Sequence, residues 1–171
     1  MKTYKVDVDD DGNKFWYLND RLHREDGPAI EYSDGTKYWY LNDQCHRDDG
    51  PAIEDANGSK YWYLNGKRHR TDGPSVEYAS GSKLWYLNGK LHREDGSSVE
   101  YADGSKEWYL NGKRHRTDGP AVEWANGSKK WFLNNEELTE TDWRKQTQKV
   151  KAPCVGKVVE VDGVKYKLVE A

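Results

Sequence analysis

A tryptophan recurs every 23 residues along most of this 171-residue chain, and the sequence around each one is nearly the same. The fullest copies read Trp-Tyr-Leu-Asn-Gly-Lys-x-His-Arg-x-Asp-Gly-Pro-Ala-Val-Glu-Tyr-Ala-Asp-Gly-Ser-Lys. Five complete units cover residues 16–130, with a half unit before them and a fragment at 131–134 after them. A fixed period of this length is typical of repeat arrays, in which each unit packs on its neighbours. We expect the recurring indoles to form one structural ladder: Trp16, Trp39, Trp62, Trp85, Trp108 and Trp131.

The composition limits the kind of core that such an array can build. Hydrophobic residues make up 35% of the chain and charged residues 33%, but there are eight tryptophans and twelve tyrosines. Large amphipathic rings with few aliphatic side chains favour a thin sheet that is wetted on one face. The net charge is only −3 and basic and acidic residues alternate, so we predict no direct nucleic-acid binding.

Nothing in the sequence indicates a membrane protein or a disulfide-stapled one. No apolar run reaches the length that a membrane span needs, and the N-terminal residues contain no apolar leader segment. The two cysteines, Cys45 and Cys154, are expected to be free thiols. The sequence therefore predicts a cytoplasmic protein.

Each unit contains two runs in which side chains alternate between two faces. In the run 37–41, Lys37, Trp39 and Leu41 are expected to point one way and Tyr38 and Tyr40 the other. Because Trp39 and Leu41 have invariant equivalents, we assign them to the structural face, together with the aliphatic residue of the second run. The residue before each tryptophan varies widely and is expected to be mostly exposed: Phe15, Tyr38, Tyr61, Leu84, Glu107 and Lys130.

Asn-Gly and Asp-Gly pairs separate the runs and predict type I′ hairpin turns at both ends of each unit. The pairs at one end are Asp34-Gly35, Asn57-Gly58, Asp103-Gly104 and Asn126-Gly127, and those at the other end are Asn65-Gly66, Asn88-Gly89 and Asn111-Gly112. The predicted fold class is all-β, an elongated single antiparallel sheet of stacked 23-residue β-hairpin repeats.

The pattern changes after residue 134, which divides the chain into an array at 1–134 and a cap at 135–171. Residues 138–145 are typical of a short helix, with Thr139 as its N-cap and Asp142 three residues later. We expect Leu138 and Trp143 to close over the last repeat. Residues 158–161 and 164–168 flank an Asp-Gly pair and predict a final hairpin.

The motif His-Arg-x-Asp-Gly occurs five times and contains every histidine of the chain: His23, His46, His69, His92 and His115. Equivalent copies cannot supply the single asymmetric arrangement that catalysis requires, so we expect no catalytic residue and no enzyme. Histidines on successive units would lie about 9–10 Å apart, too far for one metal ion, so no metal site and no cofactor is predicted. We expect instead hydrogen bonds and ion pairs between units, such as Arg70 with Glu94 or Asp95.

The face opposite the tryptophans is the candidate protein-binding surface. A tyrosine follows each tryptophan, and we expect these rings to lie beside the glutamates of the second run (Glu31, Glu54, Glu77, Glu100 and Glu123). Tyrosine and arginine are favoured at protein interfaces. A solvated face is an equally good interpretation of the same pattern. The candidate binding residues are Tyr40, Tyr63, Tyr86, Tyr109, Arg47, Arg70, Arg93 and Arg116.

The Asn-Gly-Lys-x-His and Tyr-Ala-Asp-Gly-Ser-Lys steps resemble those of MORN-type repeats over about residues 8–134. The units differ in having arginine after the histidine and one more residue between tryptophan and Asn-Gly. This variant is similar to repeats of bacterial and phage MORN-type proteins. The resemblance implies a non-enzymatic scaffold that binds a protein, such as a phage-encoded inhibitor of a bacterial defence system (for example an anti-CRISPR protein in the host cytoplasm), or an antitoxin.

A second function class stays open at this point. An aromatic groove with arginine and histidine could sequester a small ligand such as a nucleotide signal. The sequence leaves the partner, the binding face and the oligomeric state undetermined.

Overall fold

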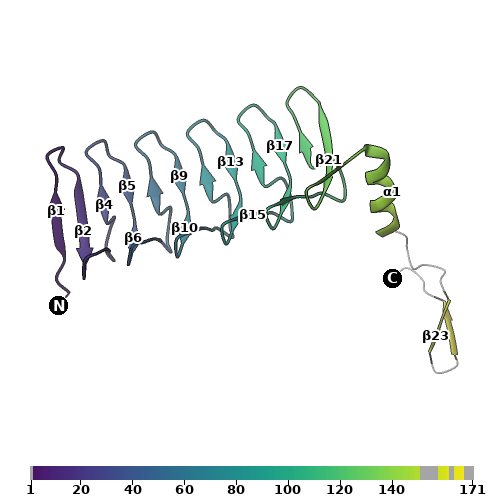
Figure 1. Ribbon diagram of the computed structural model, residues 1–171, viewed down its shortest axis with the longest axis horizontal. Helices are drawn as coiled ribbons and strands as arrows, with labels where there is room; N and C mark the ends of the chain where they lie inside the picture. Colours follow the sequence, from purple (N-terminus) through teal and green to yellow (C-terminus); the bar gives the residue numbers. More distant parts are fainter. Residues whose placement is uncertain (1, 151–157, 162–163, 168–171) are drawn as a thin grey trace.

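The computed structural model describes residues 2–150, 158–161 and 164–167, and its array is one long ribbon of antiparallel strands (Figure 1). Within the described residues the main sheet has 14 strands, in sequence order across the ribbon, with helix α1 (Glu140–Val150) beyond its last strand. The predicted all-β array of hairpins repeated about every 23 residues is confirmed. Its strands are β1 (Lys5–Val8), β2 (Lys14–Leu18), β3 (Arg21–Leu22), β4 (Ile30–Glu31), β5 (Lys37–Tyr38), β8 (Ile53–Glu54), β9 (Lys60–Tyr61), β12 (Val76–Glu77), β13 (Lys83–Leu84), β16 (Val99–Glu100), β17 (Lys106–Glu107), β20 (Val122–Glu123), β21 (Lys129–Leu133) and β22 (Glu136–Leu138).

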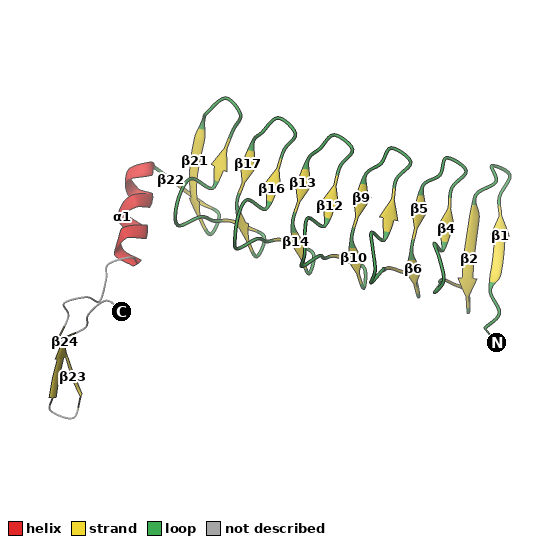
Figure 2. Ribbon diagram, turned by 180° about the vertical axis from the view of Figure 1, so that it is seen from behind, coloured by secondary structure: helices red, strands yellow, loops and turns green. Residues whose placement is uncertain are grey.

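Four repeats also contain a second, smaller hairpin at the predicted Asn turn, whose separation from the main sheet the sequence pattern did not reveal (Figure 2). The first run divides at its tryptophan, so that β5 ends before Trp39 and a new strand begins after it. The Trp39 amide donates to Ala52 O at 2.9 Å, while the Trp39 carbonyl accepts from His46 N at 3.0 Å. The tryptophan backbone thus joins the main sheet to the small hairpin. These hairpins are β6 (Tyr40–Leu41) with β7 (Gln44–Cys45), β10 (Tyr63–Leu64) with β11 (Lys67–Arg68), β14 (Tyr86–Leu87) with β15 (Lys90–Leu91), and β18 (Tyr109–Leu110) with β19 (Lys113–Arg114).

The turns of the small hairpins have the predicted type I′ geometry. Asn65 and Gly66 have φ values of 49° and 73°, and Leu64 pairs with Lys67 across this two-residue loop. Positive φ at both central residues is what a type I′ turn requires. The prediction is confirmed here.

At the opposite end of the repeat the type I′ prediction is wrong. Tyr32 N donates to Thr36 O at 2.9 Å, and Gly35 N donates to Tyr32 O at 3.0 Å. Gly35 has a φ of 94°, whereas Asp34 is not among the residues with positive φ. The loop therefore has three residues, a type I turn followed by a glycine bulge, and it contains one residue more than the predicted turn.

This extra loop residue sets which side chains share a face. Glu54 lies opposite Lys37 and Lys60 on the neighbouring strands, and Ile53 lies opposite Tyr38 and Tyr61. The glutamates therefore lie on the same side as the tryptophans, and the aliphatic residues lie with the tyrosines, which reverses the predicted assignment. We call the two sides the tryptophan face and the tyrosine face. A row of alternating charges crosses the tryptophan face: Lys14, Glu31, Lys37, Glu54, Lys60, Glu77, Lys83, Glu100, Lys106, Glu123 and Lys129.

The most buried side chains lie on the tyrosine face rather than with the indoles. Val76 is 0% exposed and lies between Tyr61 and Leu84 on the adjacent strands. The residues that precede the tryptophans flank this aliphatic row and were predicted to be mostly exposed. They are half-buried, so that prediction is wrong for all of them except Lys130, which is exposed. All six tryptophans of the ladder are half-buried.

Two rows of side-chain hydrogen bonds tie each repeat to the next. At the three-residue turns a buried hydroxyl accepts a backbone N–H of the following repeat, as Ser59 Oγ does from Ala79 N at 3.0 Å. At the small hairpins a histidine ring accepts the amide of the next turn, as His46 Nδ1 does from Asn65 N at 3.1 Å. These contacts bring each unit's turns into register with those of its neighbours.

The helix closes the C-terminal end of the array largely as predicted. Thr139 Oγ1 accepts from Asp142 N at 3.1 Å, which confirms the expected N-cap. Leu138 ends β22 and is not part of the helix, whose range of Glu140–Val150 extends beyond the predicted end. Trp143 is 8% exposed, and its Nε1 donates to Arg116 O at 2.8 Å. The final hairpin forms from β23 (Val158–Val161) and β24 (Val164–Lys167), while residue 168 lies outside the described residues.

We expect Trp143→Ala to lower the free energy of unfolding by about 3 kcal/mol, because it removes a buried ring and leaves the Arg116 carbonyl unpaired. For a chain of this size the corresponding fall in Tm is roughly 6–12 °C. Calorimetry would measure it. Trp124→Ala is the matched control, because Trp124 is 39% exposed, and it should change stability by less than about 1 kcal/mol. Equal effects from the two variants would contradict the capping role.

Candidate functional site

The structure places the eight candidate binding residues on opposite faces. Tyr38 and Tyr40 stack on the tyrosine face, with ring centroids 6.4 Å apart. Arg47 lies over the Trp39 ring, 4.2 Å from its centroid, and donates to Glu54. The predicted combination of tyrosines rimmed by these glutamates does not occur, because the glutamates point to the tryptophan face.

Each arginine of the His-Arg-x-Asp-Gly motif is held within its own repeat. The Arg70 guanidinium lies 4.1 Å from the Trp62 centroid, and its Nε donates to Asp72 Oδ1 at 2.9 Å. Its NH1 donates at 3.2 Å to both Pro74 O and Glu77 Oε1. The predicted pairing of Arg70 with Glu94 or Asp95 is therefore wrong. The same stack recurs at Arg24, Arg47, Arg93 and Arg116, with distances of 3.9–4.2 Å.

The glycine of this motif leaves room for the arginine. A Cβ at Gly73 would lie 3.0 Å from Cζ of Arg70, a tight contact that would oblige the guanidinium to shift by a few tenths of an ångström. The loop can fold over the guanidinium because glycine leaves that space free. The arginine–tryptophan stack thus accounts for the arginine, aspartate and glycine of the motif.

The histidines have the structural role that the repetition predicted. His46 Nδ1 lies 3.1 Å from Asn65 N and 2.9 Å from Asn65 Oδ1, both in the next repeat, and Nε2 lies 3.2 Å from Asp48 Oδ1. No group of three or more histidine, cysteine or acidic side chains in the described part of the chain could hold a metal ion. Burial raises the pKa of the Cys45 thiol to about 12, so this thiol is unreactive at neutral pH. Cys154 lies outside the described residues.

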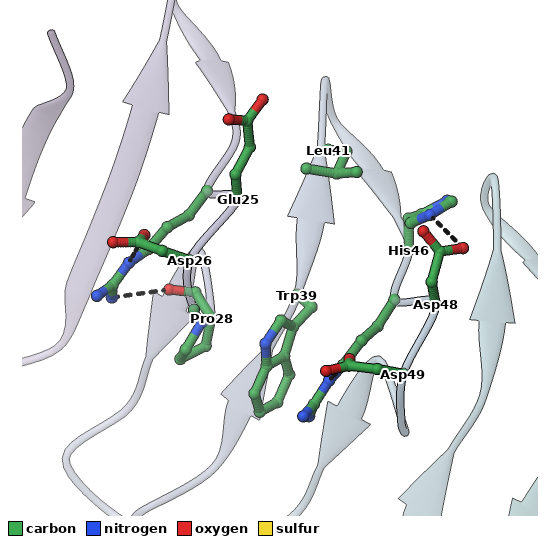
Figure 3. A pocket seen from close by; sticks show the side chains of 11 residues that line it. Glu25, Asp26, Pro28, Trp39, Leu41, His46, Asp48 and Asp49 are labelled. Atoms are coloured by element: carbon green, nitrogen blue, oxygen red, sulfur yellow. Dashed lines mark hydrogen bonds and ion pairs between the residues drawn. The ribbon is translucent and has the colours of Figure 1, made fainter. Parts of the chain in front are cut away.

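The residues of each His-Arg-x-Asp-Gly motif form a loop on the tryptophan face, which we call an arginine loop. A groove opens between each pair of successive arginine loops, and Figure 3 shows the first of these grooves. In the first groove Trp39 and Leu41 lie between loop 24–28 and loop 46–49. Its volume is about 650 Å³, and three further grooves with equivalent linings have volumes of about 530, 490 and 610 Å³. The four grooves contain Trp39, Trp62, Trp85 and Trp108.

The rims of these grooves are acidic. The side chains of Asp49, Asp72 and Asp95 are 80–84% exposed, whereas the arginines that they bind are only 22–25% exposed. Carboxylates outnumber guanidinium groups in the lining of every one of the four grooves. A ligand entering one of these grooves would meet carboxylates at its rim and the indole and leucine beneath them.

The tyrosine face presents groups of packed aromatic rings. Tyr32 packs edge-on against Phe15 at 6.2 Å and Tyr38 at 5.7 Å, and Tyr61 packs in the same way against Tyr78 at 5.9 Å. One row of this surface, next to the three-residue turns, is well exposed: Tyr32 (37%), Tyr78 (37%), Tyr101 (43%) and Trp124 (39%). This row was not predicted as a surface, although its signal is present in the sequence, since each ring stands two residues after a buried aliphatic residue.

The predicted tyrosines form a second row on the same face, and they are half-buried. The guanidinium of Arg68 lies between two of these rings, 5.9 Å from the Tyr63 centroid and 5.2 Å from that of Tyr86. Arg114 takes the same place between Tyr109 and Phe132, at 5.6 and 5.5 Å. Arg68 and Arg114, which the sequence analysis did not select, are therefore the arginines that accompany the tyrosines.

The tyrosine face changes in character along the array. The row that begins with Phe15 continues through aromatic and aliphatic residues as far as Leu84 and then becomes charged at Glu107 and Lys130. Glu107 accepts from Tyr109 OH at 2.7 Å and from Arg114 Nε at 3.1 Å. Burial and the hydrogen bond to this carboxylate raise the pKa of Tyr109 to about 12. The N-terminal half of the face is apolar, and the C-terminal half is a polar network.

The sequence matches no protein-family model and no curated protein. The repeated hairpins do not by themselves identify MORN-type repeats, so that resemblance stays a prediction. No helix among the described residues is long and apolar enough to cross a membrane.

The arginine loops make stability dependent on pH. Hydrogen bonds from Arg47, Arg70 and Arg93 lower the pKa of Asp49, Asp72 and Asp95 below the ordinary value of 3.8. A lowered folded-state pKa gives stability that is fully present above about pH 4 and is lost as the pH falls through that lowered value. We therefore expect Tm to fall between about pH 4 and pH 2.

Thermal unfolding across this pH range would measure the effect. A variant with Asn at positions 49, 72 and 95 should show a flatter decline in Tm, because its loops carry no titrating carboxylates there. The matched control replaces three exposed aspartates outside the loops, Asp10, Asp11 and Asp20, with Asn. An identical pH profile for the loop variant and the natural chain would contradict this assignment.

Proposed function

We propose that this protein is a non-catalytic scaffold that binds a partner protein through its tyrosine face. The observation that carries the proposal is the row of exposed rings at Tyr32, Tyr78, Tyr101 and Trp124. Aromatic rings combine a large apolar area with few rotatable bonds, and they dominate the energy of many interfaces. Exposed aromatic groups of this kind are typical of an interaction site.

The candidate arginines of the tryptophan face do not strengthen this surface. The guanidinium of Arg70 already serves Asp72, Pro74 and Glu77, so it has few donors left for a partner. By contrast, Arg68 lies between the half-buried rings of Tyr63 and Tyr86 on the tyrosine face. We therefore place Tyr40, Tyr63, Tyr86 and Tyr109 in the interface and leave Arg47, Arg70, Arg93 and Arg116 out of it.

Repetition supports a binding role over a catalytic one. The histidines occur in equivalent settings, each hydrogen-bonded to the next repeat, and none is placed beside a nucleophile in a unique arrangement within the described residues. The nucleotide-binding alternative is disfavoured by the acidic rims of the grooves, because carboxylates repel phosphate and the arginines there are already paired.

The resemblance to bacterial and phage repeats favours a bacterial defence protein as the partner, with a toxin as the alternative. Affinity capture from bacterial lysates that contain defined defence systems, followed by mass spectrometry, would identify it. Recovery of no stoichiometric partner by the natural chain would contradict the proposal.

The binding face can be tested with a matched pair of variants once a partner is recovered. We expect the triple change Tyr32→Ala, Tyr78→Ala and Tyr101→Ala to weaken binding by about 100-fold or more, because interface rings of this kind each contribute about 1–2 kcal/mol. The control changes the exposed residues Lys37, Lys60 and Lys83 on the opposite face to Ala and should leave the affinity within about threefold. Titration calorimetry measures both. Full affinity in the tyrosine variant would exclude this face as the interface.

A further inference from the structure

The acidic grooves of the tryptophan face form a second, periodic surface that the proposed function does not use. Each groove has the same components: an indole and a leucine between two arginine loops, with exposed carboxylates at the rim. Four such grooves follow one another along the array. What fits one groove therefore fits the others, provided that the ligand has the same spacing.

The spacing of the grooves follows from the sheet. Each repeat contributes two neighbouring strands to the main sheet, as β5 and β8 or β9 and β12 show. Neighbouring strands lie about 4.8 Å apart, so successive grooves are about 9.6 Å apart. A ligand lying along the array must therefore present one side chain on the same side about every 9.6 Å.

Among regular backbones the polyproline II helix matches this spacing best. It has three residues per turn and a rise of 3.1 Å, so every third side chain points the same way about 9.3 Å further on. An α-helix presents a side chain on the same side after seven residues, about 10.5 Å further on. Over the three intervals between four grooves, its side chains would therefore be displaced from the grooves by roughly 3 Å. A β-strand returns every two residues, at about 6.7 Å, and does not match.

The lining of the grooves determines which side chain would enter. Exposed carboxylates stand at the groove rims, above the half-buried indoles, among them Asp49, Asp72, Asp95, Glu25, Asp48 and Glu94. Lysine and arginine fit such a site, because their aliphatic stems pack on apolar surface while their charged ends reach carboxylates. Prolines between these basic residues would keep the segment in the polyproline II conformation, which is suited to binding over aromatic side chains.

We propose that the tryptophan face binds a polyproline II segment of a partner protein that carries a basic residue at every third position, one in each groove. Basic residues at this spacing are the recognition element, and the prolines hold them in place before binding. The site is separate from the tyrosine face, so the two surfaces can be tested independently.

The peptide (Lys-Pro-Pro)4 tests the proposal when its binding is measured by titration calorimetry or intrinsic tryptophan fluorescence at low ionic strength. Its control, (Lys-Pro-Pro-Pro)4, carries the same number of lysines on the same type of backbone, but they recur about every 12.4 Å and rotate out of line. We expect (Lys-Pro-Pro)4 to bind at least about tenfold more tightly than this control, and (Glu-Pro-Pro)4 not to bind. Equal affinity for the two lysine peptides would overturn the proposal.

A variant of the grooves can be made with residues that the repeats themselves use. Glu25, Asp48 and Glu94 stand at the motif position that two other repeats fill with Thr71 and Thr117. The triple change Glu25→Thr, Asp48→Thr and Glu94→Thr should therefore fold, and we expect it to weaken (Lys-Pro-Pro)4 binding by about fivefold or more.

The triple alanine variant at Tyr32, Tyr78 and Tyr101 serves as the opposite control and should bind the peptide like the natural chain. Loss of peptide binding in that variant, or unchanged binding in the threonine variant, would overturn the assignment to the grooves. Light scattering provides the remaining test. A dimer that the threonine variant breaks up would show that a second copy occupies this face instead of a peptide.

Discussion

The stacking of each arginine on the tryptophan of its own repeat is the interaction on which the rest of the structure depends. The Trp62 backbone joins the main sheet to the small hairpin, and its ring supports the Arg70 guanidinium 4.1 Å away. That guanidinium in turn fixes the loop by binding Asp72 and Glu77, and the glycine at position 73 leaves room for it. A planar cation with donors on several edges can make all these contacts at once, which lysine could not do. The loop ridges, and therefore the grooves between them, follow from this one arrangement.

Much of the fold could be predicted from the sequence because the period and the local turn residues are strong signals. The repeat length, the Asn65-Gly66 type of turn, the Thr139 cap and the closing position of Trp143 were all correct. The assignment of the faces failed for a single reason. A two-residue turn at Asp34-Gly35 would place Ile30 opposite Trp39, whereas the actual three-residue loop places Ile30 opposite Tyr38. One additional loop residue moves a whole strand's side chains to the other face.

The candidate site was harder to predict for the same reason and for one more. Sequence periodicity identified Tyr40 and Arg47 as recurring residues but could not show that they lie on opposite faces. Nor could it show that each arginine binds the acidic residues of its own repeat. An aspartate two residues after the arginine and a glutamate seven residues after it also recur in every repeat, so the pattern is equally compatible with contacts between neighbouring repeats. Arg68 and Arg114 escaped notice because they are not periodic: leucine or cysteine stands at the same position elsewhere.

In the proposed scaffold role, the two faces would solve complementary problems. Identical grooves set a spacing, but a ligand bound to them alone could shift by one repeat at little cost, because each groove resembles the next. The tyrosine face breaks this symmetry, since it changes from apolar residues such as Tyr38 and Leu84 to the charged pair Glu107 and Arg114. A partner that contacts both faces would pay a desolvation penalty for any shift that places its apolar surface on the charged end. Periodicity thus supplies the spacing, and departures from periodicity supply the register.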